Sequence, residues 1–536
     1  MNSHDTIKTS TNNKTGILSL ITKIVLIQLL LTSIDNNRHC QAFSTTNIKY
    51  PSYRMKVTRP LSRNQLHSNH GQNKQSMKKT VLSNSKEDDE KNIIQKATPY
   101  LTVMAPLVMV YISNQWSRSS IYYLVNFSQE ATASSSINVD LGFSETEYGF
   151  LASIGFTALY AVASLFAGSI SDSSNRKTIT YASCAAWTLA TVSTALATSY
   201  NNVLASRVFM GLSCAFTTPA AYTIIRDVFP KDQAAFASSI FSSAIYVAGA
   251  LSSLTILLDS SFGWRGALYA ISIFGLGAIL ASSLVLPNSV GLADKDDNAA
   301  LTKFNNPISG AKDVLSNPIV PYLFLASFLR FSSGLTIGIW SAAYFRQTFP
   351  DLTTQYAVTN ALIVGLCGVT SNLLGGYLAD KFANISANKY NLSQNAGRVI
   401  VPMLSSLLAV PTWYLCIQSS ATSFELAMIW LAVEYIVAEC WVGPTIAILQ
   451  STVNKTYGGT AQGLFTLMGA LANAAPALLG YFYQQQNGVV GDGGVSVLGE
   501  FLSLGVCGCY ALSFLVFIGL FFKLKEQGDD ALLKTK

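Results

Sequence analysis

The sequence predicts an all-α membrane protein in which twelve transmembrane helices form two pseudo-symmetric six-helix bundles. Only 12% of the 536 residues are charged, against roughly 25% in soluble proteins. The apolar residues gather into twelve blocks, each about as long as a helix that crosses ~30 Å of hydrocarbon. A polar stretch separates the first six blocks from the last six. These observations exclude a soluble enzyme, a disulfide scaffold and a nucleic-acid binder.

The positive charge and the cysteines do not indicate a ligand. The formal net charge of +7 arises largely in the first hundred residues and in short loops, so it reports membrane topology rather than a nucleic-acid partner. The eight cysteines have no metal-type spacing, and we interpret those in apolar blocks as small core residues. We therefore expect no metal and no cofactor.

Residues 1–96 have the composition of targeting segments. In residues 1–42 a basic start precedes a short apolar run, and Cys40 and Ala42 fit a signal-peptidase site. Residues 43–96 are predicted to be a disordered, transit-peptide-like segment, without an acidic residue from Phe43 to Lys86. The order of the two segments, with Ala42-Phe43 at the junction, resembles the bipartite presequence of algae with complex plastids. We expect a plastid envelope. The alternatives are another endomembrane, or a basic cytosolic tail behind an uncleaved anchor.

The twelve spans follow in two groups. An N-terminal bundle at residues 98–287 and a C-terminal bundle at residues 319–523 are joined by a polar linker at 288–318 and followed by a tail at 524–536. The expected spans are 98–127, 147–171, 179–199, 202–225, 234–258, 265–286, 319–345, 355–380, 398–418, 424–450, 459–483 and 497–523. Lysine and arginine concentrate in the loops of one side, whereas the other side has only Arg265 and Arg346. Both termini are thus placed in the compartment of synthesis.

The two groups of spans resemble each other. Gly168 and Asp172 end the second span, and Gly376 and Asp380 end the eighth with the same spacing. Internal repeats of this kind are common in secondary transporters. The pattern favours a duplication, with chance as the alternative.

Five ionisable residues lie inside the spans, all on the first helix of a three-helix unit. They are Arg118, Arg207, Arg330, Glu434 and Glu439, in spans 1, 4, 7 and 10. A charge at a helix centre costs ~2.5–3.5 kcal/mol, so each needs a partner or a watery cavity. The pattern predicts a polar central cavity. The alternatives are structural ion pairs and, for Arg207, a side chain that extends to the interface.

This cavity suits an anionic head group. We expect guanidinium donors from Arg118 and Arg330, with polar and aromatic walls from Asn114, Trp116, Tyr122, Trp340 and Trp441. For the tryptophans, core packing or an interfacial belt is an equal alternative. Glu434 and Glu439 lie about 140° apart around a helix. Burial favours the protonated form of such a group and a nearby arginine favours the ionised form, so either suits a proton carrier; we prefer Glu439.

A loop motif follows the second span. Gly168-Ser-Ile-Ser-Asp172 and then Arg176-Lys177 resemble the loop signature of the major facilitator superfamily, and the likeness covers residues 98–523. Ser173 and Asn175 depart from that signature. We expect a conformational latch of charged loop residues, formed by Gly168, Asp172, Arg176, Lys177, Asp227 and Asp380.

Within that superfamily the chain is most similar to the spinster-like lipid transporters. Arg207, Asp227-Val-Phe229, Trp340 and Glu439 match their pattern, whereas Ser117 and Cys214 replace two acids of that family. The resemblance implies a secondary transporter that works by alternating access, not an enzyme. Its expected solute is an anionic or zwitterionic amphipath such as a lysolipid, with proton coupling as an option.

Two other functions remain open. One is a plastid exchanger of small organic anions or phosphate, and the other is a membrane sensor or scaffold that has kept the fold without transport. The expected partners are the lipid bilayer and a small-molecule or lipid solute, with the protein as a monomer and without nucleic acid.

Overall fold

A computed structural model of the protein describes residues 99–128, 132, 134, 136–173, 175–229, 231–288, 307–390, 392–453, 458–486 and 496–534. These residues are helical apart from short turns and loops, and no strand occurs among them. The predicted signal peptide at 1–42 and transit-peptide-like segment at 43–96 lie outside the described residues, as does most of the predicted linker. The predicted all-α class is confirmed.

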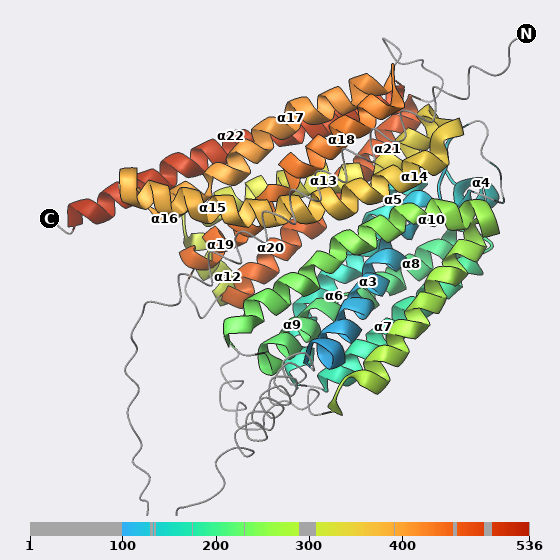
Figure 1. Ribbon diagram of the computed structural model, residues 1–536, viewed down its shortest axis with the longest axis horizontal. Helices are drawn as coiled ribbons and strands as arrows, with labels where there is room; N and C mark the ends of the chain where they lie inside the picture. The colour runs from blue at the N-terminus through green and yellow to red at the C-terminus, as the bar shows by residue number, and fades with distance from the viewer. Residues whose placement is uncertain are drawn as a thin grey trace, which may run out of the picture. The chain divides into compact units, whose positions relative to one another are not determined.

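The N-terminal half, residues 99–288, supplies the first six expected spans (Figure 1). Its elements are the π-helix η1 (Tyr100–Met104), α3 (Ala105–Ser119), the 3₁₀ helix η2 (Ser120–Tyr123), α4 (Ile137–Leu141), α5 (Glu145–Ala152), α6 (Ile154–Ser173), α7 (Arg176–Ala195), α8 (Tyr200–Cys214), α9 (Thr217–Val228), α10 (Lys231–Leu280) and the π-helix η3 (Ala281–Val285).

The C-terminal half, residues 307–534, supplies the remaining spans. Its elements are α12 (Pro307–Ser316), α13 (Val320–Thr348), η6 (Pro350–Leu352), α14 (Thr353–Leu362), the π-helix η7 (Ile363–Cys367), α15 (Gly368–Tyr390), α16 (Gln394–Arg398), α17 (Ile400–Ser420), α18 (Phe424–Ala438), the 3₁₀ helix η8 (Glu439–Trp441), α19 (Val442–Thr452), α20 (Gly458–Ala472), α21 (Ala474–Gln485) and α22 (Val497–Lys534).

Eight helical segments in the described part of the chain are long and apolar enough to cross a membrane. One of them, Ile240–Val285, contains Gly263 with φ of 71° and ψ of 168°, and this left-handed turn divides it into two expected spans. The first three expected spans are helical but not among the eight. Polar residues lower the hydropathy of α3 and α7.

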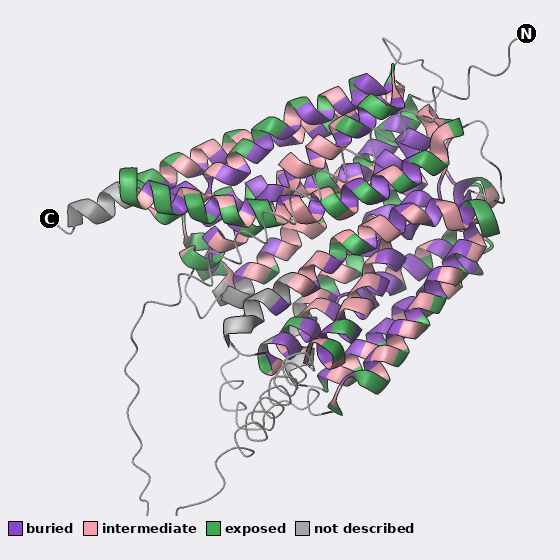
Figure 2. Cartoon of the chain, viewed as in Figure 1, coloured by how far each residue is buried: buried purple, intermediate pink, exposed green. Residues whose placement is uncertain are grey.

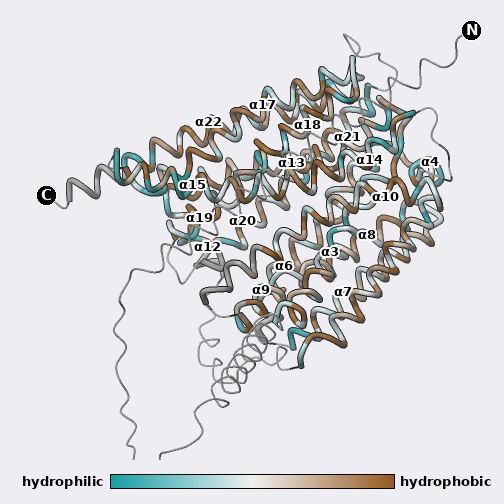
Figure 3. The backbone as a smooth tube through the Cα atoms, in the orientation of Figure 1, coloured by the Kyte–Doolittle hydropathy of each residue, from teal (hydrophilic) through white to brown (hydrophobic). Residues whose placement is uncertain are grey.

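Apolar side chains cover much of the outer surface of the helices, and charged side chains of the spans are buried, as expected for a protein in a lipid bilayer. Large apolar side chains are exposed on many helices, with Leu284 77% and Leu504 76% exposed, whereas Arg207 and Glu434 are buried (Figure 2). Hydrophobic residues run along the helices, and hydrophilic ones gather near α4 and α12 (Figure 3). This arrangement places charged groups inside the protein, where other side chains replace water as partners.

The two halves meet at the end of the helices that holds α4 and α14. There α5 packs on α21, α10 packs on α14 and α13 packs on η2 (Figure 1). Two glycines permit the closest approach, because a Cβ at Gly149 would lie 3.2 Å from the Pro476 carbonyl oxygen and one at Gly480 would lie 2.7 Å from that of Glu145. The hydrogen bonds between the halves concentrate at this end, opposite the loops that follow α6 and α15.

Candidate functional site

Two arginines of the N-terminal half share one aromatic ring. The guanidinium carbons of Arg118 and Arg207 lie 4.7 Å and 5.3 Å from the centre of the Phe156 ring. Arg207 is 1% exposed and its Nη1 donates to the Arg118 carbonyl oxygen at 2.7 Å. Arg118 is only partly buried, and its side chain lies beside the Tyr122 hydroxyl. The ring stabilises both cations through cation–π attraction.

A glycine brings this ring to the arginines. Gly211 lies one helical turn after Arg207 on α8, and a Cβ there would collide with the Phe156 carbonyl oxygen of α6. Small residues let membrane helices approach closely in this way. The Arg207-x-x-x-Gly211 spacing thus sets both the contact between α6 and α8 and the position of the Phe156 ring.

Neither arginine has an acidic partner. Among the described residues, no ion pair involves Arg118 or Arg207. Ser117 and Cys214 stand where the spinster-like pattern has acids, and the side chain of Cys214 lies near both arginines. The N-terminal half therefore holds two positive charges in its interior without a neighbouring carboxylate.

In the C-terminal half, by contrast, positive and negative charges occur together. The Arg330 guanidinium lies 4.5 Å from the Tyr510 ring centre and 5.5 Å from that of Trp441. Tyr510 donates to Glu434 Oε1 at 2.7 Å. Arg330 is also an electrostatic neighbour of both Glu434 and Glu439. The predicted arginine and both predicted glutamates thus lie in one cluster.

The two clusters share a structural motif. Arg207 donates to the carbonyl oxygen of Arg118, one residue before α3 ends and η2 begins. Arg330 donates through Nη2 to the carbonyl oxygen of Ala438, the last residue before η8. In each half, a buried arginine therefore binds the backbone where a span changes from α to 3₁₀ geometry.

Glu439 connects the C-terminal cluster to the N-terminal half. Its carboxyl group lies beside the Tyr246 hydroxyl of α10. Glu439 is partly buried, whereas Glu434 is only 3% exposed. Arg118 lies at Phe156 whereas Arg330 lies at Tyr510 and Trp441, so the two predicted arginines belong to separate clusters.

Most other predicted wall residues have structural partners. Asn114 donates to Thr217 Oγ1 at 3.1 Å and Trp116 donates to Thr255 Oγ1 at 2.9 Å, both within the N-terminal half. Trp340 is fully buried and donates to the Pro476 carbonyl at 3.0 Å. Trp441 packs edge-on against Phe331 at 4.9 Å. Tyr122 is the predicted wall residue that lies beside Arg118.

The predicted latch residues form pairs within each half. Arg176 makes an ion pair with Asp227, and Lys177 donates to Asn288 Oδ1 at 2.8 Å. In the C-terminal half Arg398 lies 3.5 Å from Asp380. The side chain of Asp172 lies outside the described part of the chain, and Gly168 has no side chain to pair. The latch between halves stays a prediction.

The sequence analysis missed an ion pair at the end of the helices opposite the predicted latch loops. Arg346 of α13 and Asp259 of α10 are both buried and lie 3.6 Å apart. Arg346 also donates to the carbonyl oxygens of Tyr123 and Val125 at 2.9 Å and 3.1 Å. The sequence placed Arg346 in a loop. The sequence did contain a signal for this pair, because Asp259 directly follows the fifth expected span and Arg346 directly follows the seventh.

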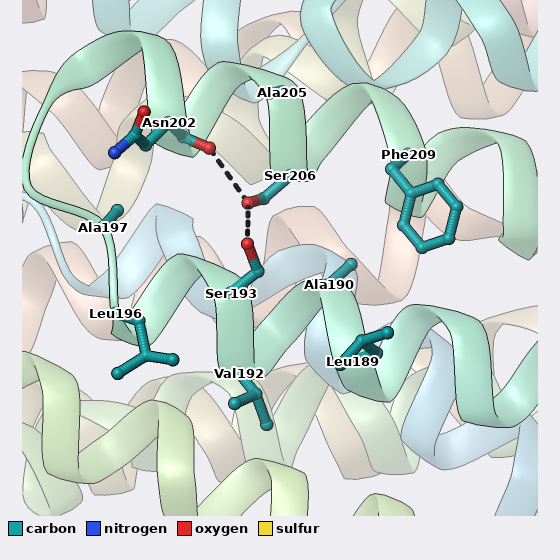
Figure 4. A pocket seen from close by; sticks show the side chains of 10 residues that line it. All are labelled: Leu189, Ala190, Val192, Ser193, Leu196, Ala197, Asn202, Ala205, Ser206 and Phe209. Atoms are coloured by element: carbon teal, nitrogen blue, oxygen red, sulfur yellow. Dashed lines mark hydrogen bonds between the residues drawn. The ribbon is translucent and has the colours of Figure 1, made fainter.

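Two hollows lie beside α7 and α8. The larger, of about 500 Å³, is open, is lined by residues such as Leu189 and Phe209, and contains no charged group (Figure 4). Within it the Ser206 hydroxyl lies 2.9 Å from both Ser193 Oγ and the Asn202 carbonyl. The smaller, of about 10 Å³, is more enclosed than the first and is lined partly by Ser117 and Arg207. Only the smaller one adjoins the arginine cluster.

The sequence is similar to those of known membrane transporters. The family model of the Major Facilitator Superfamily matches residues 108–476. An MFS-type efflux pump of Mycolicibacterium smegmatis is 24% identical over 372 residues, covering 69% of this chain and 82% of the pump. A probable galactarate/D-glucarate transporter of Bacillus subtilis is 24% identical over 444 residues, covering 76% and 92%.

Solved structures give the same fold. A bacterial homologue of the human lysosomal transporter Spinster, in an inward-facing and unoccupied conformation, aligns with a TM-score of 0.61. The two chains are 18% identical, and the alignment covers 80% of this chain and 97% of the homologue. At this identity the likeness concerns the fold alone.

Proposed function

Because the chain belongs to the Major Facilitator Superfamily, a family of integral membrane transporters, we propose that it is a secondary transporter of an anionic or zwitterionic amphipathic solute such as a lysolipid. The halves alternate in opening the site to the two sides of the membrane. The observation that carries this proposal is the partly buried Arg118, which has no acidic partner among the described residues.

A polar stripe on α3 would guide the head group. Tyr111, Gln115, Arg118 and Tyr122 recur every three or four residues, so they share one helix face. A carboxylate or phosphate would accept hydrogen bonds from the guanidinium. Tyr160, which is partly buried and near Arg118, would contact the apolar part.

The C-terminal cluster would bind the proton. When Glu434 and Glu439 are both ionised, their two negative charges exceed the single positive charge of Arg330. A proton on Glu439 would leave Arg330 with less compensation and strengthen its attraction for the anion. Arg330 would thus join Arg118 at the head group only after protonation, which couples the solute to the proton.

A second candidate is an exchanger of small organic anions or phosphate. The galactarate/D-glucarate transporter to which this chain is similar handles a sugar diacid, by its name. Among the described residues neither Arg118 nor the buried Arg207 has an acidic partner, and the combined positive potential of the two at the partly exposed Arg118 suits a doubly charged solute better than a zwitterion. The plastid envelope of an alga with a complex plastid remains our proposed location, and a fluorescent fusion of residues 1–96 would test it.

The deciding experiment is uptake by proteoliposomes that contain the full chain. Lysophosphatidic acid, lysophosphatidylcholine, glucarate and phosphate are offered with and without an inward proton gradient. Proton-stimulated uptake of the lysolipids alone supports the main proposal, and uptake of glucarate or phosphate alone supports the exchanger. Absence of flux for every solute, with the protein folded and oriented, would overturn both proposals in favour of a sensor or scaffold.

A further inference from the structure

The second span is divided where it passes the arginine pair of the N-terminal half. Helix α5 ends at Ala152 and α6 follows, and Ser153 between them has φ of −111° and ψ of −86°, outside helical values. A helix bends readily where its ladder of backbone hydrogen bonds is interrupted. Phe156, whose ring contacts Arg118 and Arg207, lies within one turn after this break. The break is therefore adjacent to the proposed solute site.

The two parts of this span have different neighbours. Helix α5 packs on α21 of the C-terminal half, and the Tyr148 hydroxyl donates to the Ile339 carbonyl oxygen of α13 at 2.6 Å. Helix α6 packs mainly on α8 of its own half. Separation of the halves at the end that holds α4 and α14 therefore requires α5 to leave α21, whereas the contact between α6 and α8 can persist. We call α5, residues Glu145–Ala152, the gate helix.

One hydroxyl connects the arginine pair to the gate helix. Tyr122 of η2 is buried, and its hydroxyl is a hydrogen-bond neighbour of both Arg118 and Arg207. The same hydroxyl donates to the Ala152 carbonyl oxygen at 3.4 Å, which is long for an O–H···O bond. A phenol has a single hydrogen to donate. The end of the gate helix is thus bound by a donor that also faces the arginines.

We propose that Tyr122 couples solute binding at Arg118 to release of the gate helix, an inference that rests on the proposed function. An anionic oxygen bound to Arg118 is a stronger acceptor than a backbone carbonyl. The hydrogen of Tyr122 therefore turns to the solute and leaves the Ala152 carbonyl. A buried carbonyl that loses its donor destabilises the position of the gate helix. The helix then bends at Ser153, and its contacts with the C-terminal half loosen.

Amide hydrogen–deuterium exchange of the purified full chain in nanodiscs tests this coupling, because it reports local opening of single helices. Lysophosphatidic acid and glucarate, the probes for the two candidate functions, are compared with no addition. In the unchanged chain, a bound probe should slow exchange in α3 beside Arg118. The same probe should speed exchange in the gate helix about two- to tenfold, as expected for the loss of one ordinary hydrogen bond.

Tyr122→Phe removes the hydroxyl and keeps the ring. In this variant the gate helix should exchange fast without any probe, and a probe should slow exchange in α3 without changing the gate helix further. Tyr269→Phe is the matched control, because it removes a hydroxyl from a side chain that is 40% exposed on α10. The control should respond to the probe as the unchanged chain does.

The possible results separate this inference from the proposed function. A probe that slows exchange in α3 but leaves the gate helix of the unchanged chain as it was overturns the inference and leaves the proposed function standing. A gate helix that responds equally in Tyr122→Phe and in the unchanged chain also overturns it, because the coupling then bypasses the hydroxyl. If no probe alters exchange anywhere, the proposed function fails and the inference fails with it.

Discussion

Arg346 and Asp259 form a buried ion pair that joins the two halves of the protein, with 3.6 Å between Nη2 and Oδ2. Each side chain is at most 5% exposed. Arg346 also donates to the carbonyl oxygens of Tyr123, the last residue of η2, and of Val125, so one residue of the C-terminal half contacts two spans of the N-terminal half. If the halves separate at this end, all of these bonds break.

We therefore predict that Asp259→Asn shifts the protein toward the state that is open at this end. Loss of one partner from a buried pair costs about 3–5 kcal/mol, and here the cost falls on the closed state. Spin labels at Thr198 and Thr422, exposed residues in loops of the two halves at this end, should report a longer distance. Asp140→Asn removes a pair within the N-terminal half, Arg265–Asp140, and should leave the distance unchanged. An unchanged distance in Asp259→Asn would show that the pair does not hold the halves together.

Arg118→Gln should weaken solute binding without unfolding the protein. A hydrogen bond to a charged group contributes about 1.5–3 kcal/mol, so the apparent affinity should fall about tenfold or more. The measurement is the concentration dependence of uptake in proteoliposomes. Arg265→Gln, at the partly exposed Arg265–Asp140 pair, serves as the control. Uptake that is saturated at the same concentration in Arg118→Gln and in the unchanged chain would remove Arg118 from the site.

Glu439→Gln should separate exchange from proton-driven uptake. The amide cannot take up and release a proton, so a proton gradient should no longer accumulate solute, while exchange of labelled for unlabelled solute should continue. Glu434→Gln provides the comparison, because Glu434 is more deeply buried and hydrogen-bonded to Tyr510. If only Glu434→Gln loses accumulation, Glu434 carries the proton and our preference for Glu439 is wrong.

Gly211→Ala should destabilise the N-terminal half. The added methyl group meets the Phe156 carbonyl, and overpacking of this kind costs about 1–3 kcal/mol. It would also move the Phe156 ring away from Arg118 and Arg207. Gly277 of α10 has open space at its Cβ position, so Gly277→Ala should melt at or slightly above the temperature of the unchanged chain. Equal melting of the two variants would contradict a tight contact between α6 and α8.

The sequence was sufficient for the fold because hydrocarbon thickness fixes span length and because buried charges are rare. Twelve apolar blocks and the charged residues of spans 1, 4, 7 and 10 could therefore be found by inspection. The partners of these charged residues could not be found in the same way. The pairing of Arg330 with Glu434 and Glu439, rather than with Arg118, depends on which helices pack together across more than one hundred residues. Asp259 and Arg346 escaped notice because a charge near the end of a span usually faces water, whereas contact with the other half buries these two.

The change from α to 3₁₀ geometry after Ser119 and after Ala438 has a mechanical consequence. A helix bends easily where its regular ladder of backbone bonds is interrupted, provided that the released oxygen atoms keep a donor. Arg207 and Arg330 are such donors, and each stands on a neighbouring helix rather than on the one that bends. Spans 1 and 10 can therefore flex at mid-membrane while the oxygen stays satisfied. Each guanidinium would serve as a pivot, and the flexing points are adjacent to Arg118 and Glu439, the side chains that we propose bind the solute and the proton.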